Sequence, residues 1–69
     1  MSNTIPKDTR ILVTNSKDIP GYHVALASGL GDVTVFSDFE DAKRYVEGHL
    51  NGILVGGAAN NGARVWFYA

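Results

Sequence analysis

The 69-residue chain contains no cysteine and only two histidines. Without cysteine it has no disulfide bond, no zinc-finger pattern and no thiol redox chemistry. The two histidines, His23 and His49, are isolated in the sequence and do not form the spaced pair of ligands that is typical of a metal site. We therefore expect neither a metal nor another cofactor.

An excess of charge of one sign is also lacking, as are long apolar runs. Six Lys and Arg residues stand against seven Asp and Glu residues, which gives a formal net charge of −1. Proteins that bind a nucleic-acid polymer usually carry a basic excess, so we do not expect that partner. No apolar run approaches the roughly 18–20 residues that cross a bilayer. Residues 1–4 show no secretory signal pattern. We expect a cytoplasmic protein that does not contact a membrane.

The length of the chain allows one domain, and a small one. A folded chain of this size buries only about 60% of the surface that its unfolded form exposes, so its core is marginal. Small folds compensate with disulfides, a metal or oligomerisation. With the first two excluded, we predict a homo-oligomer built from a single domain over residues 10–69, preceded by a flexible lead over residues 1–9.

One segment has strong helix signals. Ser37 and Glu40 have the spacing of a capping box, in which each side chain bonds the backbone amide of the other residue. An apolar stripe follows at spacings of three and four residues, and Asn51-Gly52 is typical of a left-handed helix end. The sequence predicts a helix over about residues 38–50, whose buried stripe consists of Phe39, Ala42, Val46 and Leu50.

The remaining apolar segments have the composition of β-strands separated by turns. Dense turn signals occur at 15–21, at 29–32 and at Asn60-Asn61-Gly62. We predict an α+β fold of two layers, an antiparallel sheet with one main helix, that assembles as a closed homo-oligomer. The predicted strands span residues 10–14, 22–28, 33–36, 53–58 and 64–68.

The predicted sheet has more apolar surface than one helix can cover. Alternation in the last strand places Val65 and Phe67 on one face, and Arg64, Trp66 and Tyr68 on the other. If the helix covers the first face, Trp66 and Tyr68 remain exposed, and such a patch favours self-association. In the alternative interpretation, the last strand curls and Trp66 lies in the core of the monomer.

The segment Ile11 to Tyr22, with the sequence ILVTNSKDIPGY, resembles the opening of the YbjQ-like family, which is described as heavy-metal-binding. The segments Asn51–Gly56 and Arg64–Ala69 are similar to the family's last two strands, so the quoted segments cover about a third of the chain. It implies a two-layer fold that assembles into a closed ring, as in the dodecins of the same fold group. The region between these segments is shorter than in the family, and the metal ligands do not transfer.

Two stretches rich in backbone amides are candidate ligand sites. Gly56-Gly57 lets backbone approach a phosphate or sugar closely, or only permits close packing of strands. Asn60 and Asn61, followed by Gly62, present amides in the same way, although Asn-Gly is also the commonest hairpin turn. Neither stretch carries a Walker-type lysine or a dinucleotide fingerprint.

Arg64 and Trp66 share a face of the last predicted strand. An arginine beside an indole suits a phosphate that is attached to an aromatic base, and the same residues are also enriched at subunit interfaces. Tyr22 and His23 are candidates to line the same pocket, and Arg10 is a candidate to flank it. Packing or exposure to solvent is the alternative for these three residues.

No Ser/His/Asp or Cys/His spacing indicates catalysis, so we do not expect an enzyme. The leading hypothesis is a homo-oligomer that sequesters a small anionic ligand, derived from a nucleotide, at its subunit junctions. Compact phage proteins that act as sponges for nucleotide immune signals offer an analogy of size and architecture. The alternative hypothesis is a metal-binding or purely structural YbjQ-like oligomer.

Overall fold

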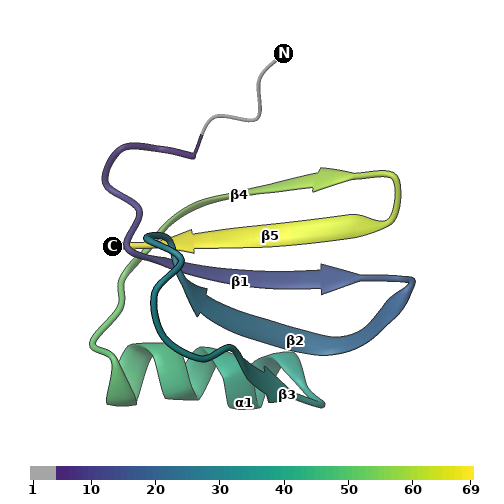
Figure 1. Ribbon diagram of the computed structural model, residues 1–69, viewed down its shortest axis with the longest axis horizontal. Coiled ribbons are helices and arrows are strands. Elements are labelled where there is room, and N and C mark those ends of the chain that lie inside the picture. The colour runs from purple at the N-terminus through teal and green to yellow at the C-terminus, as the bar shows by residue number, and fades with distance from the viewer. Residues whose placement is uncertain (1–4) are drawn as a thin grey trace.

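The computed structural model describes residues 5–69, so residues 1–4 of the predicted lead lie outside the described part. It has five strands in one antiparallel sheet, in the order β3-β2-β1-β5-β4, with a helical segment below the sheet (Figure 1). This confirms the predicted α+β class. The elements are β1 (Ile11–Ser16), β2 (Ile19–Leu26), β3 (Thr34–Phe36), α1 (Phe39–Arg44), the π-helical turn η1 (Tyr45–His49), β4 (Leu54–Asn60) and β5 (Ala63–Tyr68).

The turn between β1 and β2 is shorter than the predicted stretch 15–21. Only Lys17 and Asp18 form the turn, and Pro20 and Gly21 belong to β2. The Asn15 side-chain amide donates a hydrogen bond to the Gly21 carbonyl at 2.9 Å, beside an irregularity in the β1–β2 register. Gly21 has a φ of 95°, so this glycine bends the strand and does not end it.

The hairpin between β4 and β5 follows the sequence prediction. Asn61 and Gly62 form its two-residue turn, with φ values of 50° and 83°. Positive φ at both positions is the geometry of the turn that matches the twist of paired strands, and Asn-Gly adopts it readily. Asn61 and Gly62 therefore shape the hairpin.

The helical segment lies where it was predicted, but its N-terminal cap and its last turn differ from the prediction. Asp38 occupies the N-cap position and no side chain bonds the first amides, so the predicted capping box of Ser37 and Glu40 is wrong. The last turn is π-helical, with the Leu50 amide bonded to the Tyr45 carbonyl at 3.1 Å. The left-handed helix end that was predicted at Asn51-Gly52 is confirmed at Asn51, where φ is 57°.

The helix covers the face of the sheet that was predicted to be exposed. Tyr68 is only 1% accessible and lies in the core, and Trp66 is half-buried against that core. In the register, Tyr68 pairs with Ile11 and Trp66 with Val13, which are both fully buried. Ala42 and Val46 of the helical segment are also fully buried. Because their side chains are small, they leave room between the helix and the sheet for the rings of Trp66 and Tyr68. The predicted exposure of Trp66 and Tyr68 is therefore wrong, and the alternative interpretation holds for Trp66.

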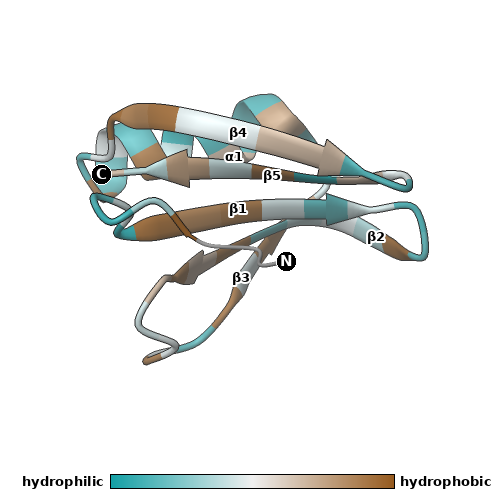
Figure 2. Ribbon diagram, turned by 90° about the horizontal axis from the view of Figure 1, so that it is seen from above, coloured by the Kyte–Doolittle hydropathy of each residue, from teal (hydrophilic) through white to brown (hydrophobic). Residues whose placement is uncertain are grey.

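The opposite face of the sheet carries a second apolar set, and within residues 5–69 no helix lies over it. Leu12 pairs with Phe67 in the register, and Thr14 with Val65, so these residues share that face. Figure 2 shows this face from above, with the helix beneath the sheet and the N-terminal segment passing over β1. The sheet therefore has a second apolar face, as the sequence indicated. That face carries Leu12, Val65 and Phe67 and not Trp66 and Tyr68.

Candidate functional site

A cluster of aromatic rings lies between the helix and the sheet. The ring centres of Phe39 and Trp66 are 4.6 Å apart, and Tyr22 lies 5.7 Å from Phe39 and 5.9 Å from Trp66. The guanidinium carbon of Arg64 lies 5.9 Å from the centre of the Trp66 ring. The predicted proximity of Arg64 and Trp66 is confirmed, but three neighbours already surround the indole. This contact is a cation–π interaction within the chain.

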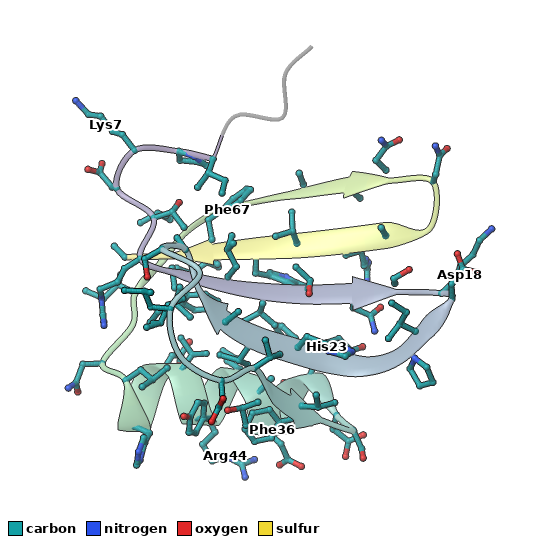
Figure 3. All side chains as sticks on the ribbon, viewed as in Figure 1. Lys7, Asp18, His23, Phe36, Arg44 and Phe67 are labelled. Atoms are coloured by element: carbon teal, nitrogen blue, oxygen red, sulfur yellow. The ribbon has the colours of Figure 1, made fainter. Side chains whose placement is uncertain are left out.

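A hollow of about 580 Å³ lies on the uncovered face of the sheet. Its floor consists of residues of β1, β4 and β5, and Ile5 and Pro6 of the N-terminal segment form one wall. Figure 3 shows Phe67 on this side of β5, directed toward that segment. The volume lies within the range of small-molecule sites, which is about 300–1,000 Å³. We name this feature the sheet hollow; its lining consists of Ile5, Pro6, Leu12, Thr14, Asn15, Ser16, Ala58, Ala59, Asn60, Ala63, Arg64, Val65 and Phe67.

The sheet hollow has an apolar end and a polar end. Leu12 and Phe67 pair near the start of β1, and Val65 lies next along β5. Toward the hairpin, the residues are Thr14, Ser16 and Asn60, which offer hydroxyl and amide groups. Arg64 is the one charged residue among the lining residues, and its guanidinium lies over Trp66 on the helix side. The side chains that face the hollow therefore form a neutral surface.

The structure divides the predicted ligand-binding residues between the two faces. Tyr22 belongs to the aromatic cluster, whereas the adjacent His23 lies on the opposite face, between Thr14 and Val35 in the register. The His23 Nε2 atom is 3.1 Å from the Pro20 carbonyl oxygen. Alternation along the strand separates the two neighbours, so they cannot line one pocket.

Gly56 and Gly57 lie within β4, directly after a register shift between Leu54 and Gly56, and Gly56 pairs with Phe67 and Gly57 with Trp66. Successive amides of an extended strand point to opposite edges, so these two do not converge on one anion. A Cβ atom at Gly57 would lie 3.2 Å from the Val65 carbonyl oxygen, a tight approach, whereas Gly56 has more room. The packing interpretation explains Gly57.

Arg10 lies at the other end of the sheet from Arg64. It precedes Ile11, which pairs with Tyr68, whereas Arg64 pairs with Asn15. The Arg10 Nη2 atom donates a hydrogen bond to the Leu50 carbonyl at 2.7 Å, at the end of the π-helical turn. Arg10 therefore binds the end of the helix, and it does not flank the same site as Arg64.

The two predicted asparagines have different positions. Asn60 lines the sheet hollow, and Asn61 lies in the turn between β4 and β5.

Of the residues that line the sheet hollow, the sequence predicted only Asn60 and Arg64 as ligand-binding. Alternation correctly placed Val65 and Phe67 on one face of the last strand, and this shared face was the sequence signal for the floor of the hollow. Their face was then assigned to the helix, so neither residue was proposed as ligand-binding. The wall formed by Ile5 and Pro6 had no signal, because their position depends on how the chain folds back over β1.

Among the lining residues of the sheet hollow, Arg64 alone carries a charge. Burial, and second the charge of Glu47, raise the pKa of the Tyr68 hydroxyl above its ordinary value. Over residues 5–69, no three His, Asp or Glu side chains lie close enough together to bind a metal ion. Within the same range, no helix has the length and apolarity to cross a membrane.

Comparison with known proteins found no family model, no curated protein and no solved structure that matches this chain. The resemblance to the YbjQ-like family thus stays a prediction that rests on the quoted residues.

Proposed function

We propose that this protein is a non-catalytic homo-oligomer that binds and sequesters a small molecule in the sheet hollow. The observation that carries the proposal is a hollow of about 580 Å³ that is bounded by two apolar side chains from β5, Val65 and Phe67, and by the segment at Ile5 and Pro6. Hollows of this size with apolar walls and a few polar groups are the usual form of ligand sites.

The lining selects the chemistry of the ligand. A flat apolar or aromatic body fits against Leu12, Val65 and Phe67, where its burial is favourable at about 25 cal/mol per Å². Hydroxyl or amide groups of the ligand match Thr14, Ser16 and Asn60 at the other end. A neutral or weakly polar ring compound is therefore the favoured class. The lining residues include no carboxylate or imidazole, which supports binding without chemistry.

The second candidate is the anionic, nucleotide-derived ligand that the sequence favoured. Arg64 is exposed, and its guanidinium lies against the aromatic cluster, so a phosphate could approach it from the helix side. A base would then have to displace Arg64, Phe39 or Tyr22 from the Trp66 ring. For that reason we favour the sheet hollow.

Thermal-shift measurements separate the two candidates. The screen contains uncharged aromatic compounds, flavins, nucleotides and divalent metal ions. We expect a neutral ring compound to raise the Tm of the native chain, because a ligand that binds only the folded state stabilises it. The shift should be lost in Phe67→Ala and retained in Arg64→Gln, whereas dependence on Arg64 alone would indicate the nucleotide site.

Two matched controls make this comparison sharp. Val35→Ala also removes an apolar side chain from the uncovered face, at β3 and outside the hollow. Arg44→Gln removes one positive charge from an exposed position of α1, as Arg64→Gln does from β5. A ligand shift that Phe67→Ala retains, or a screen in which only metal ions raise Tm, would overturn the proposal.

A further inference from the structure

Within residues 5–69, the strand β4 has no neighbour along one edge of the sheet over its seven residues, Leu54–Asn60. At the opposite edge of the described sheet, β3 has three residues. Very short edge strands resist pairing with another chain, whereas long ones without charge or proline invite it. No Asp, Glu, Lys, Arg or Pro occurs between residues 51 and 63. The β4 edge therefore lacks charge and proline, and its protection is limited to the register shift between Leu54 and Gly56.

The start of this edge also exposes apolar side chains. Ile53 is 69% accessible, Leu54 53% and Val55 46%. Three consecutive exposed aliphatic residues at a strand edge are unfavourable in a monomer, because they leave apolar surface in water. The rest of β4 consists of Gly and Ala residues before Asn60, so another backbone can approach it closely.

We infer that β4 pairs antiparallel with β4 of a second copy, which joins the two sheets into one. This dimer deepens the proposed function, and it specifies which surface makes the oligomer. When a strand pairs antiparallel with its own copy, a two-fold axis brings the same backbone groups together from both sides. Such pairing requires that the side chains of the two copies carry no charges that repel. The uncharged stretch from residue 51 to 63 meets that condition.

The hairpin geometry sets the register of the pairing. Asn60 and Ala63 flank the two-residue turn and form a hydrogen-bonded pair, as that turn requires. Hydrogen-bonded pairs alternate along an antiparallel ladder, so Gly57 and Ala59 direct their backbone groups toward the free edge. This alternation holds from Gly56 to Asn60, because the register shifts between Leu54 and Gly56. A two-fold axis at Gly57 then brings Ala59 beside the partner's Val55, at the register shift.

The dimer has a consequence for the sheet hollow. Ala58, Ala59 and Asn60 of β4 form one side of the hollow, at the edge where the second copy adds its strand. A two-fold axis perpendicular to the joined sheet keeps both uncovered faces on one side and both helices on the other. The two hollows then adjoin across β4, and each copy contributes residues to a shared groove at the subunit junction.

The test measures the oligomeric state without ligand, by light scattering after size exclusion and by sedimentation equilibrium over a wide range of concentrations. We expect the native chain to form a dimer. Val55→Lys should raise the dimer dissociation constant about tenfold or more, because it places a charge at the paired edge. Ala59→Pro should have a similar effect, because it removes the amide that points toward the partner.

Leu30→Lys is the matched control, since Leu30 is 73% accessible in the loop between β2 and β3 and the change adds the same charge. It should leave the dimer intact, and circular dichroism should show that all variants fold. A monomer at every concentration, or a dimer that both β4 variants retain, would overturn the inference. Loss of the dimer in Val35→Lys alone would also overturn it, because that would move the interface to β3. A ligand shift that depends on Phe67 in a monomeric protein would leave the proposed binding site standing.

Discussion

The ring centres of Phe39 in α1 and Trp66 in β5 lie 4.6 Å apart, with their planes tilted by 34°. This contact joins the start of the helix to the face of β5 that carries Trp66. Tyr68 lies in the core on the same face, whereas Val65 and Phe67 lie on the other side. The helix packs against the face that carries Trp66 and Tyr68, so the opposite face stays uncovered and contains the proposed site.

Removal of the Phe39 ring should therefore loosen the helix from the sheet. Phe39 is half-buried, so we expect Phe39→Ala to lower the free energy of unfolding by about 2 kcal/mol, below the range for fully buried phenylalanines. The chain has one tryptophan, so the fluorescence of Trp66 reports the change directly. Its emission should shift to longer wavelength in the folded variant. Phe39→Leu should keep most of the stability, and an unchanged emission in Phe39→Ala would contradict this packing.

Gly52 should tolerate no side chain, whereas Gly48 should. A Cβ atom at Gly52 would lie 2.6 Å from Val46 Cγ1 and 3.2 Å from Ile11 Cδ1, in the core. We expect Gly52→Ala to cost about 1–3 kcal/mol through overpacking, as measured by urea denaturation. A Cβ at Gly48 would meet nothing within 4 Å, so Gly48→Ala should be neutral or stabilising by up to about 1 kcal/mol. Equal effects of the two changes would show that the helix end packs differently.

Arg10 should stabilise the end of the helical segment. Its guanidinium donates a hydrogen bond to the Leu50 carbonyl at 2.7 Å and places a positive charge at the negative end of the helix. Arg10→Met keeps the apolar stem, and we expect it to lower the free energy of unfolding by about 1 kcal/mol. Arg44→Met removes an exposed ion pair with Asp41 at 3.4 Å and should change stability by less than about 0.5 kcal/mol. If the two variants unfold at the same denaturant concentration, the Arg10 contact does not stabilise the fold.

Stability should decrease in alkaline solution through Tyr68. Burial, together with Glu47, raises the pKa of its hydroxyl above the ordinary value of 10.0 in the folded state. The unfolded state therefore loses its proton first as the pH rises, so the free energy of unfolding falls from about pH 10 upward. Below that pH this contribution is complete and constant. Denaturation of Tyr68→Phe across the same pH range should show a smaller decrease, and identical slopes for both proteins would contradict the assignment.

Local patterns in the sequence predicted most of the elements. The strands, the Asn61-Gly62 turn and the stripe of Ala42 and Val46 depend on neighbours within a few residues, so the sequence contains their signals. The capping box was a local signal that failed, because Asp38 and not Ser37 occupies the N-cap. Nothing in the spacing indicated the π-helical turn at Tyr45–His49, whose geometry accompanies the packing of Gly52 against Val46.

The choice of the covered face is not a local property. Ile11 to Val13 is apolar at every position, and Val65 to Tyr68 is as well, so alternation alone gives two equivalent solutions. The pairings make β3 and β4 parallel strands at opposite edges, with α1 between them in sequence. The right-handed rule for such crossovers selects one face, but only once the strand order is known. The position of the sheet hollow also depends on the strand order, because its floor is the face of the sheet that the helix leaves uncovered.

Native mass spectrometry of the protein, purified from its own cells without denaturation, tests binding and self-association in one measurement. The account predicts a dimer that carries the additional mass of a small organic molecule, and Phe67→Ala should yield the dimer without that mass. A bare monomer for the native chain, at the concentrations at which it is purified, would contradict it.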